Sequence, residues 1–226
     1  MKSGALARQY FRHRFAVLFY TLILTLGAGP LVAALDLNRN WLRIFLELNL
    51  FVAVFGFAPT RHSRLLRLGF MLVLGARLLT LLLETRPLAI ATQPLVILLA
   101  FGAAVGALSF ALRASHVDTE HVYAALDAYL LAGVFSGMLH FEIERAWPGS
   151  YTSGGAALAA FPLSTAVYFS FVTLATLGYG DIVPQSEVAR GVTVVEAIAG
   201  QLYLAVLIAR LVSNATRSGA RGAPAA

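Results

Sequence analysis

The chain has 226 residues, of which 59% are hydrophobic and 12% are charged, and its formal net charge is +6. It contains no cysteine, which excludes disulfides, thiolate metal sites and a cysteine nucleophile. Basic residues that bind nucleic acid gather on one water-facing patch, whereas here they separate long apolar blocks. The composition therefore predicts a membrane protein without a nucleic-acid partner.

Six apolar segments along the chain have the length needed to cross a bilayer as helices. They are residues 15–35, 42–58, 65–83, 88–112, 122–141 and 188–212. The first follows a basic stretch and ends in small residues, so a cleaved signal peptide is an alternative. Its apolar block is long for a signal, and its removal would leave an odd number of crossings, which favours a membrane helix.

A seventh apolar stretch, residues 161–177, is short for a full crossing. It opens with Phe161-Pro162, and a proline suits the first turn of a helix. We therefore expect a re-entrant helix that starts at Pro162. Residues 214–226 consist largely of Ser, Gly, Ala and Arg, and this composition predicts a disordered tail.

The basic residues are distributed unequally between the two sides of this arrangement. With six crossings and an inner N-terminus, eleven fall on the inner side: Lys2, Arg8, Arg12, Arg14, Arg61, Arg64, Arg67, Arg113, Arg210, Arg217 and Arg221. Five fall on the outer side, namely Arg39, Arg43, Arg86, Arg145 and Arg190, and Arg77 lies within the third segment. Because Lys and Arg are enriched in cytoplasmic loops, we expect a multi-pass protein of the cell inner (plasma) membrane with both termini in the cytoplasm.

The segment between the last two long apolar blocks reads Thr173-Leu-Ala-Thr-Leu-Gly-Tyr-Gly-Asp181 and resembles the signature of the bacterial potassium channel family. It departs from the usual form at Ala175, where a threonine often stands, and at Leu177, where valine is commonest. Alone, Gly-Tyr-Gly is also compatible with an ordinary turn. Its position after a helix-length apolar stretch favours the channel motif.

The resemblance implies an all-α membrane protein with six transmembrane helices, a re-entrant pore helix and a filter loop, assembled as a tetramer. The parts would be a cytoplasmic N-terminus (1–14), a four-helix transmembrane domain (15–113), a pore domain (114–213) and the disordered tail (214–226). The implied function is passive, potassium-selective conduction. The implied partners are three further copies of the chain and membrane lipids, with K⁺ in the filter and no cofactor.

The residue types of the motif suit the ion, because K⁺ must exchange its hydration water for other oxygen ligands. The expected ligands are the backbone carbonyls of Thr176, Leu177, Gly178 and Tyr179 together with the Thr176 hydroxyl, and Gly180 completes the filter. Successive carbonyls face one axis only where the backbone alternates between right- and left-handed conformations, which the two glycines permit. One chain supplies too few oxygens, so four chains around an axis are implied.

Three residues beside the filter are expected to support it. The resemblance implies this role for Thr173, Tyr168 and Asp181, with a hydrogen bond from Tyr168 to Asp181, while simple packing is the alternative for Tyr168. Val172 stands where some relatives carry a glutamate behind the filter, so the acid-linked inactivation of those relatives is not expected.

The last long helix contains the candidates for the inner cavity and the gate. Ala197, Gln201, Leu204 and Ile208 share one helical face by their three- and four-residue spacing, and we assign that face to the cavity. Ile208 is the candidate for an apolar constriction. Gly200 stands at the family's hinge glycine, and close helix packing is an equal alternative.

Two acidic residues lie at membrane depth, where a carboxylate is costly and calls for nearby partners. Glu196 lies off the cavity face, and we expect it to face the pore helix in a hydrogen-bonding role or in coupling to protons or gating. Asp127 raises the same question, and whether the two meet stays open. Arg77 and Glu47 are a candidate intramembrane pair.

The four leading helices resemble the layout of voltage-gated potassium channels, but the charges differ. The fourth segment holds no basic residue before Arg113 at its inner end. One charge that crosses the membrane contributes about 2.3 kcal/mol per 100 mV, so steep gating needs several. Arg61, Arg64 and Arg67 coincide with an inner loop and suit a helix anchor. Weak or absent voltage dependence is predicted.

Other functional classes find little support in the sequence. The histidines lack the close spacing of metal ligands, and no Gly-x-Ser-x-Gly or phosphate-binding loop is present, so no enzyme is expected. His116 and His121 fall in the inner connection before the fifth helix, where solvated polar residues are the default and pH sensing is the alternative. A non-conducting accessory subunit and a poorly selective cation channel remain the alternative functions.

Overall fold

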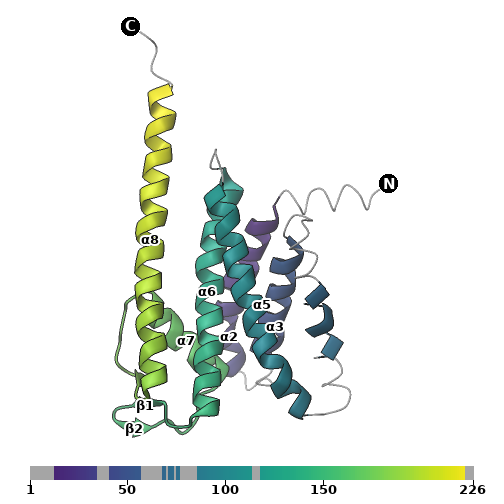
Figure 1. Cartoon of the computed structure of the whole chain (residues 1–226), viewed down its shortest axis with the longest axis vertical. Helices are drawn as coiled ribbons and strands as arrows, with labels where there is room; N and C mark the ends of the chain where they lie inside the picture. The colour runs from purple at the N-terminus through teal and green to yellow at the C-terminus, as the bar shows by residue number, and fades with distance from the viewer. Residues whose placement is uncertain are drawn as a thin grey trace. The chain divides into compact units, whose positions relative to one another are not determined.

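The computed structural model describes residues 13–34, 41–56, 68–69, 71–73, 75–76, 86–113 and 118–221. Its elements in chain order are α2 (Arg14–Ala34), α3 (Trp41–Gly56), α5 (Arg86–Arg113), α6 (Thr119–Ala146), β1 (Tyr151–Ser153), β2 (Ala156–Ala157), α7 (Leu163–Leu174), β3 (Val183–Pro184) and α8 (Glu187–Arg221). Figure 1 shows this mostly helical chain. It divides within α6 into a first unit that ends at Phe135 and a second unit that holds Ser136 and the elements after it.

Three described helices are long and apolar enough to cross a membrane. They cover Ala91–Arg113, Thr119–Ala146 and Glu187–Arg210, and shorter apolar helices cover Arg14–Ala28 and Leu163–Leu174. The first two and the last three of the six expected crossings, and the re-entrant segment, coincide with helices, whereas the third crossing (65–83) lies mostly outside the described residues. The same holds for the expectations that concern residues 1–12, 61–67, Arg77 and His116.

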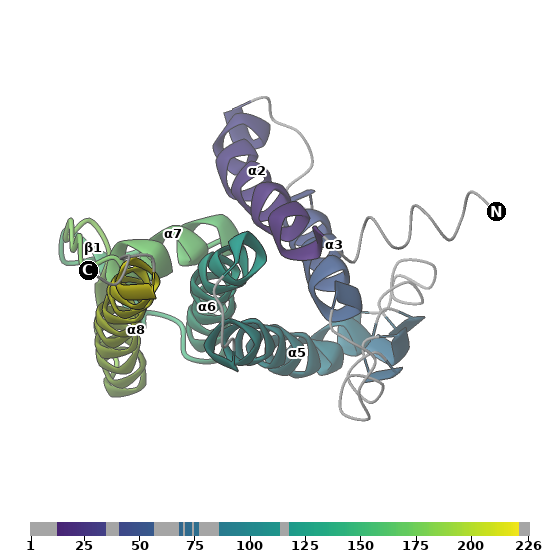
Figure 2. The same ribbon diagram turned by 90° about the horizontal axis from the view of Figure 1, so that it is seen from above.

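In the first unit, α2 and α3 lie side by side (Figures 1 and 2). Buried Asn49 of α3 donates from Nδ2 to Thr25 Oγ1 of α2 at 2.7 Å. At the start of α2, the Phe15 amide donates to Glu120 Oε2 of α6 at 3.1 Å. This bond satisfies one of the free N–H groups of the first helical turn and fixes the start of α2 against α6.

The second unit combines helices with a small sheet of strand order β2-β1-β3. Gly154 and Gly155, both with positive φ (56° and 81°), connect β1 to β2, which are the backbone values of a two-residue hairpin turn. β3 follows the loop after α7 and pairs with β1, with Tyr151 opposite Pro184. The sequence did not predict this sheet, because strands of two or three residues are too short to show an alternating pattern.

Two helix ends differ from the sequence-based expectations. α7 begins at Leu163, with Pro162 in the preceding capping position, because a proline has no N–H to offer and its carbonyl accepts the Ala166 amide at 3.0 Å. α8 continues to Arg221, so residues 214–221 are helical where the composition predicted disorder. Once a helix has formed, each added residue gains a backbone hydrogen bond, which permits this extension.

The core of the second unit is aromatic. Tyr151 stacks on Phe161, with ring centroids 4.7 Å apart and an interplanar angle of 6°, and both rings are buried. Phe169 of α7 meets Tyr151 edge-on at 5.3 Å. These contacts fix β1 against α7 and thereby place the loop that follows α7.

Candidate functional site

The loop after α7 has a backbone conformation that repeats every second residue. φ is positive at Thr176 (56°), Gly178 (55°) and Gly180 (75°). A Cβ added at either glycine would meet no atom within 4 Å, so glycine is needed there for its left-handed φ and not for space. The alternation is the pattern expected of carbonyl oxygens that line one axis.

Thr176 is the sole non-glycine residue with positive φ in the described part of the chain. A side chain in this region carries backbone strain, and such strain persists where surrounding contacts hold it. Gln201 Nε2 of α8 donates to Thr176 Oγ1 at 3.1 Å. The sequence pointed to Thr176 as a ligand, but gave no signal of its strained backbone.

The loop is tied directly to the end of α7. The Val172 carbonyl accepts the amides of Leu177 and Gly178, at 2.9 and 3.4 Å, and the Thr173 carbonyl accepts the Thr176 amide at 2.9 Å. These bonds satisfy carbonyls that a helix end leaves free. The C-terminal end of a helix also carries partial negative charge, which favours a cation near Thr176.

The large side chains of the loop are more than half exposed in the described structure. Leu177 is 56% exposed and Tyr179 is 66% exposed, although both are large and apolar or aromatic. All residues from Ala175 to Asp181 are exposed.

One hydrogen bond spans the loop from its helix to its outer end. Tyr168 Oη donates to Asp181 Oδ2 at 2.8 Å, which is the bond that the resemblance led us to expect. Beyond Asp181, β3 continues the connection, and the Gln185 amide donates to the Ser150 carbonyl at 2.7 Å. The loop is thus held at both ends.

α8 lies beside α7 in both views of the ribbon (Figures 1 and 2). Gly200 is buried, and a Cβ there would meet the Leu174 carbonyl oxygen more closely than Cβ contacts allow. This contact corresponds to close helix packing, one of the two roles predicted for Gly200. The hinge role stays a prediction. Leu204 is half-buried and Ile208 is 60% exposed, and their assignment to cavity and gate also stays a prediction.

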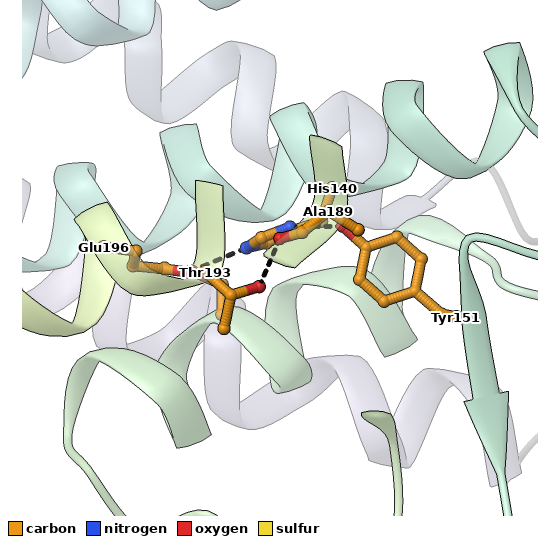
Figure 3. Close-up of polar contacts among 6 residues, drawn as sticks. His140, Tyr151, Ala189, Thr193 and Glu196 are labelled. Carbon is orange, nitrogen blue, oxygen red and sulfur yellow. Dashed lines mark hydrogen bonds and ion pairs between the residues drawn. The ribbon is translucent and has the colours of Figure 1, made fainter. Parts of the chain in front are cut away.

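Behind α7, four buried polar side chains form one chain of hydrogen bonds, most of which Figure 3 shows. Tyr151 Oη lies 2.6 Å from His140 Nδ1, and His140 Nε2 lies 2.7 Å from Glu196 Oε2 (Figure 3). Ser170 Oγ of α7 donates to Glu196 Oε1 at 2.5 Å. Glu196, on α8, therefore contacts the pore helix as expected, and its hydrogen-bond partners in the described chain are His140 and Ser170.

Burial raises the pKa of Tyr151, and the carboxylates of Glu196 and Glu144 raise it further. The tyrosine thus stays protonated throughout the neutral pH range. Sequence reasoning did not single out His140, Tyr151 or Ser170. A histidine and a glutamate within apolar helices are the signal that could have indicated this buried pair.

Asp127 is fully buried in the first unit, and neither carboxylate oxygen has a hydrogen-bond partner among the described residues. Asp127 belongs to the first unit and Glu196 to the second. The proposed partner of Glu47, Arg77, lies outside the described residues. His121 stacks on Phe110, with ring centroids 4.5 Å apart and an interplanar angle of 2°.

The sequence of the chain has recognisable relatives. Residues 125–217 match the model of a family described as an ion channel. The chain is 34% identical over 102 residues to the voltage-gated potassium channel Kch of Escherichia coli (strain K12), an alignment that covers 45% of this chain and 24% of that protein. It is 34% identical over 93 residues to two pore potassium channel c of Oryza sativa subsp. japonica, which covers 41% of this chain and 18% of that protein.

A third relative is the inward rectifier potassium channel Kirbac3.1 of Paramagnetospirillum magnetotacticum, 36% identical over 75 residues, or 33% of this chain and 21% of that protein. The chain thus spans less than a quarter of the length of each of these relatives. No solved structure matches the chain significantly.

Proposed function

We propose that this chain, whose residues 125–217 match the model of an ion channel family and whose relatives are named potassium channels, is one subunit of a tetrameric, potassium-selective channel. The observation that carries the proposal is the alternating backbone of Thr176, Gly178 and Gly180 at the end of a short apolar helix. Four such loops around an axis would supply rings of carbonyl oxygens in place of the hydration water of K⁺.

The tetramer is supported by what one chain leaves exposed. Leu177 and Tyr179 are more than half exposed, and apolar residues of α8 such as Val195 (67%) and Leu202 (61%) are exposed as well. Neighbouring copies would cover them, and cyclic symmetry closes such a ring. The proposed topology is six crossings with the re-entrant helix α7 on the outer side and both termini in the cytoplasm of a plasma membrane.

Conduction is proposed to be passive and weakly dependent on voltage. The basic residues of α5, Arg86 and Arg113, stand at its two ends, and none lies between them. Few charges of this helix would therefore move through the membrane field. The stimulus that opens the proposed inner gate around Ile208 is not part of the proposal.

Potassium and sodium flux into liposomes that hold the purified full chain tests the proposal. Selective K⁺ flux that is lost in Gly178→Asp is the expected result, because a side chain at φ 55° distorts the filter. Gly155→Asp is a matched control, since it adds the same side chain at a positive-φ glycine outside the loop. Equal flux of both ions would indicate a poorly selective cation channel, and no flux in any wild-type preparation would favour the accessory subunit.

A further inference from the structure

The hydrogen bonds that link Tyr151, His140 and Glu196 have a direction, because the Tyr151 hydroxyl at one end has a single partner among the described residues. Tyr151 is fully buried, and in the described structure its hydroxyl has only His140 Nδ1 as a hydrogen-bond partner. A buried hydroxyl proton without an acceptor is costly. Tyr151 therefore donates to Nδ1, and Nδ1 carries no proton.

The position of the His140 ring proton follows from the direction of the Tyr151 hydrogen bond. A neutral imidazole with an unprotonated Nδ1 carries its proton on Nε2, which then donates to Glu196 Oε2. Ser170 donates to the other carboxyl oxygen, Oε1. Both oxygens of Glu196 thus accept a hydrogen bond, which is the arrangement that stabilises a carboxylate.

On the premise that the chain is the proposed channel, we propose that Glu196 is a positioning residue for the filter. It is an ionised carboxylate, oriented by Tyr151 through His140, that holds the pore helix α7 against the inner helix α8. The filter begins directly after α7, so its place depends on this attachment.

The register of the two helices supports this role. The Glu196–Ser170 contact is followed, four residues later on each helix, by the contact of Gly200 with Leu174. Four residues are about one helical turn, so both contacts lie on the same face of each helix. Gln201 then reaches Thr176 in the filter. Glu196, Gly200 and Gln201 of α8 thus contact in turn the pore helix, its last residue and the filter.

The contact of α7 with α8 at Glu196 depends on hydrogen-bond donors that carry no charge. The described hydrogen-bond partners of Glu196 are a hydroxyl and an imidazole N–H, and Glu196 itself is 4% exposed. A buried carboxylate that loses a donor keeps its charge but loses its compensation. Removal of the Ser170 hydroxyl alone should therefore displace α7 from α8.

The proton assignment is tested by solid-state ¹⁵N NMR of the full chain in liposomes with labelled histidine. The His140 signal, identified by its loss in His140→Gln, is expected to show Nε2 protonated and Nδ1 unprotonated. In Glu196→Gln the amide oxygen can still accept from Nε2, so the same tautomer is expected. A doubly protonated ring or a proton on Nδ1 in the wild type would overturn the assignment.

The positioning role is tested by the ratio of K⁺ to Na⁺ flux in Ser170→Ala and Glu196→Gln tetramers recovered by size-exclusion chromatography. We expect the ratio to fall about tenfold or more, because a hydrogen bond to a buried charge is lost or weakened. Glu187→Gln is the matched control, since it removes a carboxylate of α8 whose side chain is 92% exposed. An unchanged ratio in Ser170→Ala would overturn the role.

The two tests also separate this inference from the channel proposal. If the wild type conducts no K⁺ in any preparation, the channel proposal fails, and the NMR signal still decides the direction of the hydrogen bonds. If Glu196→Gln does not assemble, Ser170→Ala decides the positioning role, because it removes one oxygen and leaves the carboxylate in place.

Discussion

Gly200 of α8 lies directly against the carbonyl oxygen of Leu174, the last residue of α7. This approach brings the backbone of the inner helix to the point where the pore helix ends and the filter loop begins. Small residues permit such close contact between membrane helices.

Gly200→Ala is therefore expected to destabilise the protein. The new methyl group meets a backbone carbonyl that cannot rotate away, and overpacking of this kind costs about 1–3 kcal/mol. A lower melting temperature of the purified assembly, with reduced K⁺ flux, is the expected measurement. Gly191→Ala on the same helix is the control, because a Cβ there meets nothing within 4 Å of the chain. Equal stability of the two variants would contradict the packing role of Gly200.

Gly137→Ala tests the contact between α6 and α7. A Cβ at Gly137 would lie 2.7 Å from Val167 Cα and 2.8 Å from Val167 Cγ2, so we expect a loss of about 1–3 kcal/mol in thermal or denaturant unfolding. Val167→Ala in the same chain removes Cγ2 but leaves Cα. It should therefore fail to restore stability, and full recovery would show that side-chain volume alone was limiting.

Tyr168→Phe and Asp181→Asn are expected to weaken the outer end of the filter. Each removes or weakens the 2.8 Å hydrogen bond between Tyr168 Oη and Asp181 Oδ2. Because the two residues share one bond, the double variant should be little worse than the poorer single variant. K⁺-dependent thermal stability of the tetramer measures this coupling. Independent, additive effects would indicate that the bond does not support the filter.

A small gating charge is expected in voltage-clamp recordings. α5 has basic residues only at its two ends, Arg86 and Arg113, and a single charge that crosses the membrane contributes about 2.3 kcal/mol per 100 mV. We expect no more than about one elementary charge per subunit. A recording of several charges per subunit would overturn the prediction of weak voltage dependence.

Some elements of this protein can be predicted from the local sequence, because they depend on residues that are neighbours in the chain. Apolar blocks of membrane length mark α2, α3, α5, α6 and α8, and the Phe-Pro start marks α7. The helical tail beyond Val212 and the small sheet escaped this reasoning. Neither the Ser-, Gly- and Arg-rich composition of the tail nor strands of two residues carry a hydrophobic period.

The sequence by itself determined the backbone of the loop after α7, because Gly178 and Gly180 adopt a left-handed conformation that other residues resist. Only the tertiary structure decided the partners of Glu196. Ser170 is 26 residues away and His140 is 56 residues away in the chain. Such pairs form when separate helices pack and bury their polar groups together, and no spacing within one helix encodes which groups will meet.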